Sequence, residues 1–80
     1  MAAWNAFVWK GKYLRWTAAN IAADNELAAK QRSVHALTCR PGHVADKDLL
    51  RLKAYLHGDA PEPEGLYIEV HQVADGPPRV

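Results

Sequence analysis

The sequence predicts a single α+β domain, in which a mostly antiparallel sheet of about four strands carries two helices on one face. Three features support this: an aromatic-rich hairpin at the start, alanine- and leucine-rich helical segments in the middle, and an alternating apolar strand near the end. The expected element order is β-β-α-β-α-β. We expect the compact domain to cover residues 1–73 and to be followed by a flexible tail over residues 74–80, whose Pro-Pro pair cannot join a sheet.

The hairpin is predicted from two runs rich in aromatic and β-branched residues, 4–9 and 13–17, around a short connection that contains Gly11. A glycine there supplies the positive φ that tight hairpin turns need. A loop of three residues would place Trp9 and Tyr13 on the same face, and a loop of two would regroup them, so the register stays open. In either register, both faces of the hairpin carry aromatic side chains.

The middle of the chain predicts a helix followed by a strand. Residues 18–31 are dense in alanine, which favours a helix, and Thr17 is a competent N-cap. A competing interpretation starts this helix at Asp24 and lets residues 18–22 extend the second strand. Residues 33–39 predict the third strand, which a Pro-Gly turn signal then ends.

Leucine spacing predicts the second helix. It begins after the N-cap Asp46 and ends before Gly58, which suits the left-handed position that follows many helices. Its apolar stripe is formed by Leu49, Leu52 and Leu56. Residues 66–73 predict the last strand, because apolar and polar residues alternate there. The face expected to meet the core holds Leu66, Ile68 and Val70.

Composition narrows the class of protein. A chain of 80 residues that builds one core has little material left to enclose a substrate cavity, which disfavours a small-molecule enzyme. Cys39 is the single cysteine, so no disulfide framework exists within the chain, and we expect a reducing, cytoplasmic setting. The apolar start of the chain is too short to span a bilayer, so we expect a soluble protein without a membrane partner.

The residues that could carry chemistry are few and scattered. His35, Cys39 and His43 are spaced four apart, but a zinc site would need a fourth ligand from His57 or His71, far along the chain. Nothing in the spacing guarantees that a histidine activates the thiol of Cys39. We therefore predict no catalytic residue, no metal site and no cofactor.

The most informative cluster is the aromatic and basic N-terminal hairpin. Residues 1–40 hold six basic and two acidic side chains, whereas residues 41–80 hold four and seven. Aromatic rings beside cations suit single-stranded nucleic acid, but Trp, Tyr and Arg also anchor protein interfaces. Because the net charge is only +1, a protein partner is favoured and nucleic acid is the alternative. The candidate binding residues are Trp9, Lys10, Lys12, Tyr13, Arg15, Tyr67 and His71.

In size and lack of chemistry, the chain resembles the small proteins encoded by phages and mobile elements, among them anti-CRISPR inhibitors. The resemblance rests on no shared motif, so no functional residue is carried over from it. It implies a non-enzymatic protein-binding inhibitor that occludes a surface of a host macromolecular complex. Self-association into a homodimer through the open sheet face is a further option, because exposed apolar patches mark interfaces.

Overall fold

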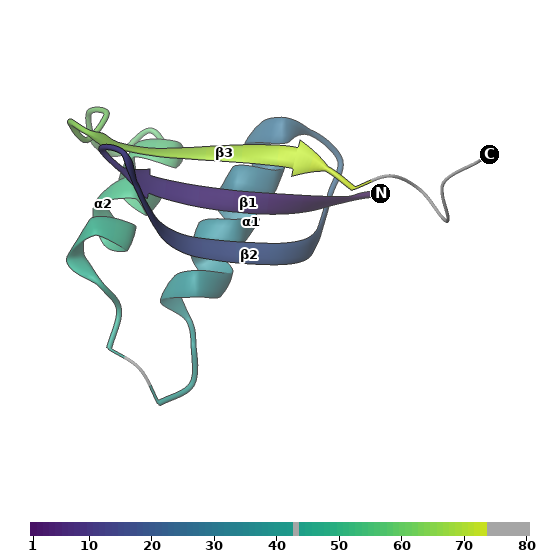
Figure 1. Cartoon of the computed structure of the whole chain (residues 1–80), viewed down its shortest axis with the longest axis horizontal. Coiled ribbons are helices and arrows are strands. Elements are labelled where there is room, and N and C mark those ends of the chain that lie inside the picture. The colour runs from purple at the N-terminus through teal and green to yellow at the C-terminus, as the bar shows by residue number, and fades with distance from the viewer. Residues whose placement is uncertain (43, 74–80) are drawn as a thin grey trace.

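Three antiparallel strands and two helices make up the fold in the computed structural model, which describes residues 1–42 and 44–73 (Figure 1). The strand order is β2-β1-β3, so the N-terminal strand is central. Both helices lie on the same side of the sheet (Figure 1). The predicted tail at 74–80 falls outside the described residues. The elements in chain order are β1 Ala2–Lys10, β2 Tyr13–Ala23, α1 Glu26–Thr38, α2 Lys47–Leu56 and β3 Leu66–Gln72.

The predicted α+β class with its helices on one face is confirmed, but the element order is wrong. The segment 33–39, predicted as a strand, forms the end of α1 and its cap, so the observed order is β-β-α-α-β with three strands. Its apolar residues suit either periodicity over so short a stretch. Helical spacing decides the outcome, because it places Ser33, Val34 and Leu37 on the same buried stripe as Ala29.

The competing interpretation of the alanine-rich segment is confirmed: β2 continues to Ala23, and the helix starts later. Thr17 is therefore a strand residue and not an N-cap. The N-cap of α1 is Asn25, whose Oδ1 accepts a 2.8 Å hydrogen bond from the backbone N–H of Ala28. The preference of alanine for a helix is weak compared with the hydrogen bonds that this segment gains by pairing with β1. This pairing keeps the segment in the strand as far as Ala23.

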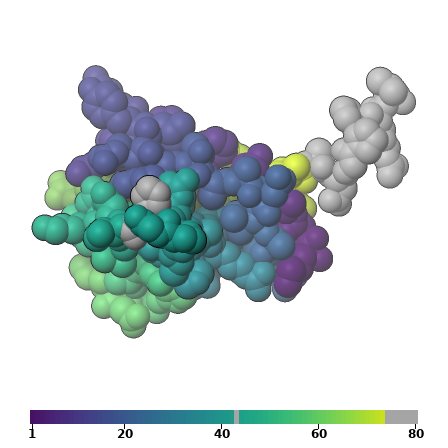
Figure 2. Space-filling view, turned by 90° about the horizontal axis from the view of Figure 1, so that it is seen from below, coloured from purple at the N-terminus to yellow at the C-terminus, as the bar shows by residue number. Residues whose placement is uncertain are grey.

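The hairpin register combines both alternatives. Lys10 pairs with Tyr13, so the turn holds two residues, and Trp9 pairs with Leu14. A bulge on β2 at Arg15 then shifts the pairing, so Trp16 lies opposite Val8 and shares its face, which is the grouping of these two residues expected from the three-residue loop. A second shift lies between Ala6 and Trp4, where Asn20 of β2 has a φ of 56°. Seen from the side of β2, the purple-to-blue segment around the turn projects from the body of the molecule (Figure 2).

The second helix and the last strand agree with their predictions. Asp46 caps α2 by accepting a 2.8 Å bond from the N–H of Asp48, and Gly58, with a φ of 79°, follows the helix. The core fills the space between the sheet and the two helices. Trp4 and Trp16 pack against its edge. The buried apolar residues are Ala6, Val8, Ala23, Ala29, Val34, Leu37, Leu49, Leu52, Leu56, Leu66, Ile68 and Val70.

Candidate binding face of the sheet

The face of the sheet turned away from the helices carries an ordered group of side chains that we call the aromatic cluster. Alternation along each strand directs these side chains away from the core residues Ala6, Val8 and Ile68. The strands β1 and β3 supply its members, although they lie far apart in the chain and pair directly in the sheet. The aromatic cluster consists of Phe7, Trp9, Tyr67, Glu69 and His71.

Two contacts between rings fix the arrangement of the cluster. Trp9 and Tyr67 are cross-strand partners, and their rings stack with centroids 6.4 Å apart and planes 13° from parallel. Phe7 and His71 meet edge to face, with centroids 5.8 Å apart. Aromatic pairs of this kind contribute about 0.5–1.5 kcal/mol beyond their buried area. The rings therefore hold each other in position on a face that neither α1 nor α2 covers.

Glu69 joins the two aromatic pairs. Its Oε1 accepts a 2.7 Å hydrogen bond from the indole Nε1 of Trp9, and its Oε2 lies 3.5 Å from Nε2 of His71. The Glu69 side chain is 45% exposed, so the carboxylate is still accessible to a ligand. The cluster thus presents a fixed negative charge between aromatic rings, a combination that suits a cation.

The predicted binding residues separate into two groups. Trp9, Tyr67 and His71 lie together in the aromatic cluster. The sequence prediction missed Phe7 and Glu69, although each is two positions from a predicted residue on its strand, and period-two alternation could have identified both.

The basic members of the predicted set lie away from the cluster. Lys10 faces the helices, where its Nζ forms a 3.0 Å ion pair with Oδ2 of Asp48 on α2. Tyr13 is the cross-strand partner of Lys10, so it extends to the same side. The ammonium of Lys12 lies over the Tyr13 ring, and the guanidinium of Arg15 lies 4.8 Å from the centroid of Trp16. These four side chains therefore do not join Trp9, Tyr67 and His71 in the aromatic cluster.

The pKa of Asp48 is lowered, chiefly by the hydrogen bond that its carboxylate accepts from Lys10. Partial desolvation of the carboxylate acts in the opposite direction and raises the pKa. The positive charges of Lys10, Arg51 and Arg15 lower it further. A carboxyl group with a lowered folded-state pKa stabilises the fold above its unfolded pKa of about 3.9, and this stability is lost as pH falls through the lower folded value.

Replacing Asp48 with Asn should therefore lower the free energy of unfolding at pH 7 by up to about 1 kcal/mol, the usual range for a pair open to solvent. Urea titrations at pH 7 and pH 2 should show wild type and variant converging in acid. The Lys10→Gln variant should lose a similar amount at pH 7, and the double variant should lose little more than either single change. Fully additive losses would show that the two side chains do not act through one another.

The histidine and cysteine candidates do not assemble a metal site within the described part of the chain. Cys39 Sγ lies 3.7 Å from the ring nitrogens of His35, and Lys53 Nζ is 3.3 Å from His35 Nδ1. Over residues 1–42 and 44–73, no group of three or more His, Cys, Asp or Glu side chains gathers closely enough to bind a metal ion. His43, the third member of the predicted spacing, is not among the described residues.

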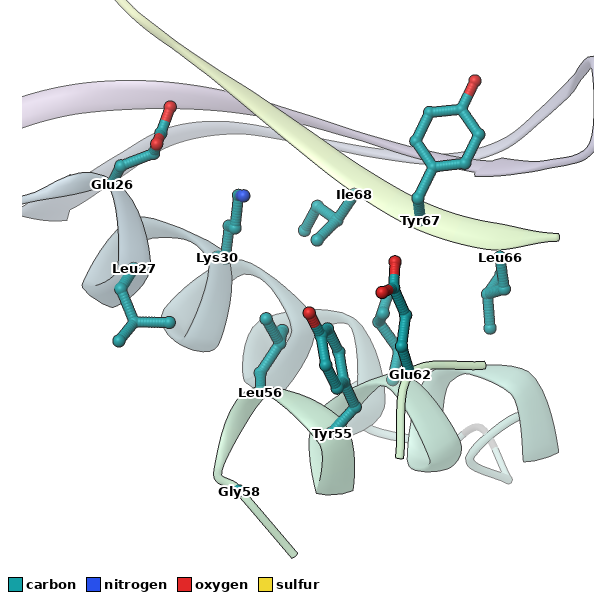
Figure 3. Close-up of a pocket in the computed structure, with 11 residues that line it drawn as sticks. Glu26, Leu27, Lys30, Tyr55, Leu56, Gly58, Glu62, Leu66, Tyr67 and Ile68 are labelled. Atoms are coloured by element: carbon teal, nitrogen blue, oxygen red, sulfur yellow. The ribbon is translucent and has the colours of Figure 1, made fainter. Parts of the chain in front are cut away.

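A groove of about 360 Å³ lies under β3, between the start of α1 and the end of α2 (Figure 3). Leu27 of α1 and Tyr55 of α2 contribute to its walls and are partly exposed. Tyr67 extends to the opposite side of β3 from Leu66 and Ile68, toward the aromatic cluster (Figure 3). The groove and the rings of the aromatic cluster therefore lie on opposite faces of β3, although Tyr67 also contributes to the lining of the groove.

No helix in the described residues is long and apolar enough to cross a membrane. Comparison with protein-family models, curated proteins and solved structures finds no significant match to this chain. The function must therefore be inferred from the arrangement of the side chains.

Proposed function

We propose that the chain is a non-enzymatic protein-binding module whose aromatic cluster docks a segment of another protein that carries an arginine or lysine. One observation supports this most directly: a half-exposed carboxylate, Glu69, is fixed between the stacked and edge-to-face rings of an uncovered sheet face. Arginine and lysine combine a positive charge for the carboxylate with a stem and head group that pack on aromatic rings. Steric occlusion of the partner's surface, in a reducing cytoplasm, is the mode of action we propose.

The same charge arrangement makes nucleic acid the weaker alternative. Single-strand binders combine stacking rings with cations that neutralise phosphates. Here the charge fixed among the rings is acidic, and Lys10, which follows Trp9 in β1, is paired with Asp48 on the helix side. A phosphate approaching the rings would meet the Glu69 carboxylate at close range, which is unfavourable.

Selection from a random-peptide display library against the immobilised chain tests this function. We expect the selected peptides to be enriched in arginine or lysine next to apolar residues. Calorimetric titration of one selected peptide and of a single-stranded oligonucleotide should then show binding of the peptide alone at physiological salt. Stronger binding of the oligonucleotide, with affinity falling steeply as salt rises, would replace the protein partner with a nucleic acid.

Glu69→Gln tests the carboxylate within that experiment. The amide keeps an oxygen that accepts the indole N–H of Trp9 but removes the charge, so we expect peptide affinity to fall about tenfold, which corresponds to about 1.4 kcal/mol for one charge-assisted contact. Glu64→Gln is the matched control, because Glu64 is an exposed loop residue outside the cluster. Equal peptide affinities for the two variants would show that the charge of Glu69 does not contribute to peptide binding.

A further inference from the structure

We infer that the free edge of β3 pairs antiparallel with β3 of a second copy of this chain, so that two sheets join into one. The backbone edge of β3 is a different surface from the rings of the aromatic cluster, although Glu69 and His71 border both. The inference does not depend on the function proposed for the cluster. The inference rests on the orientation of the backbone groups, on the regularity of the edge, and on a carboxylate–imidazole pair between the copies in one register.

Among the described residues, the outer edge of β3 presents an unpaired row of backbone hydrogen-bonding groups. The N–H of Val73 donates to Ala3 O and the carbonyl of Gly65 accepts from Gly11, so odd-numbered positions point toward β1. In an antiparallel ladder the groups alternate in direction, and therefore Ile68, Val70 and Gln72 direct theirs away from the sheet. An exposed row of this kind is a template for pairing with another strand.

The two edges of the sheet differ in how they are protected. The β2 edge is interrupted by shifts at Arg15 and near Asn20, and bulges of this kind discourage edge pairing. Pairing between β1 and β3 shows no shift from Lys10 to Trp4, so β3 is regular along its length. Within the described residues, β3 therefore offers the edge that is ready to pair.

One register satisfies both the backbone groups and the side chains beside them. With the two-fold axis at Val70, Ile68 of each copy lies opposite Gln72 of the other, and all three outward-facing positions are paired. The same register places Glu69 opposite His71 of the second copy, where an imidazole N–H can donate to the carboxylate.

The neighbouring registers are less favourable. Moving the axis to Glu69 sets two carboxylates directly opposite each other, which is destabilising. Moving it to Ile68 requires the N–H of Leu66, which is already directed to Pro63 O at 3.4 Å. Side-chain and backbone pairing therefore favour the Val70-centred register over these two.

The groove under β3 lies beside the same edge, and its lining combines apolar side chains with the charged residues Glu26, Lys30 and Glu62. A two-fold axis perpendicular to the sheet keeps the helices of both copies on one side, so the grooves of the two copies would lie on that same side of the joined sheet. Leu27 is 55% exposed and Tyr55 is 36% exposed at the groove, and both gain burial when the edges join. The uncovered faces of the two sheets then form one surface with two aromatic clusters.

Sedimentation equilibrium of the full chain tests the dimer. We expect wild type to approach twice the 8.9 kDa mass of one chain as concentration rises. Gln72→Pro should raise the dissociation constant at least about tenfold, because proline removes an outward N–H while sparing the ladder to β1. Gln72→Ala, which keeps that N–H, should dimerise like wild type. A monomeric wild type, or equal association of the two variants, would overturn the inference.

Disulfide trapping tests the register. In a Cys39→Ala background, Glu69→Cys mixed with His71→Cys should give a cross-linked heterodimer, because non-hydrogen-bonded cross-strand pairs bring Cβ atoms close enough for a disulfide. Each variant alone should cross-link far less. Efficient cross-linking of Glu69→Cys with itself would show the register centred on Glu69 and contradict the one inferred here.

Discussion

Replacing Leu52 with Ala should leave much of the protein unfolded at room temperature. Leu52 of α2 is the largest fully buried side chain among the described residues and is only 1% exposed. Removing a buried leucine side chain costs about 2–5 kcal/mol, from lost transfer free energy and the cavity left behind. A single core in a chain of 80 residues supplies about 3–5 kcal/mol of net stability. The substitution therefore removes most of what holds the domain folded.

Leu50→Ala provides the matched control on the same helix. Leu50 is 47% exposed, so the same chemical change should alter the free energy of unfolding by no more than about 0.5 kcal/mol. Urea unfolding followed by tryptophan fluorescence measures both variants against wild type. Comparable losses in the two variants would mean that the helix buries a different face from the one described.

Local sequence signals were sufficient to predict an element where several of them agreed. For α2, the N-cap Asp46, the leucine stripe and Gly58 mark both ends and the buried face, and each was found where the sequence predicted it. For β3, strict alternation identified the face that Ile68 and Val70 turn to the core. Such elements are predictable because propensity, periodicity and capping all favour the same structure.

The secondary structure in the middle of the chain was harder to predict, because the local signals there conflict with the tertiary contacts. Residues 18–23 are rich in alanine, yet they pair with the start of β1, a contact that helix propensity cannot detect. Asn20, with its φ of 56°, does not have a helical backbone. The segment 33–39 has too few apolar residues to distinguish the spacing of a helix from that of a strand. It is helical because that conformation turns its apolar residues to the core.

The candidate site was predicted only in part, because it too depends on contacts between segments far apart in the chain. Alternation places Tyr67 and His71 on one face of a strand, and Trp9 was chosen for its residue type. What brings them together is the pairing of β1 with β3, which unites Trp9 and Glu69 across 60 positions. The two-residue turn and the bulge at Arg15 also move Tyr13 to the helix side, an outcome that depends on register alone.

Replacing Trp9 with Ala should weaken binding of a selected peptide by at least about 30-fold, the loss typical of a central aromatic anchor worth about 2 kcal/mol. The indole stacks on Tyr67 and donates to Glu69, so its removal takes away a contact surface and also releases the carboxylate from its fixed position. Isothermal calorimetry is the suitable measurement, because the substitution removes one of the fluorescent reporters. Far-ultraviolet circular dichroism of the variant checks that the sheet is retained.

Two further variants separate the roles of Trp9. Trp9→Phe keeps a ring to stack on Tyr67 but has no N–H for Glu69, so its affinity should fall between those of wild type and Trp9→Ala. Tyr13→Ala is the matched aromatic control, since Tyr13 is 66% exposed on the same hairpin but extends to the helix side. If Tyr13→Ala weakens binding as much as Trp9→Ala, the partner engages the tip of the hairpin. Loss in the Trp9 variants alone locates the contact on the aromatic cluster, because the two residues differ in the face they occupy.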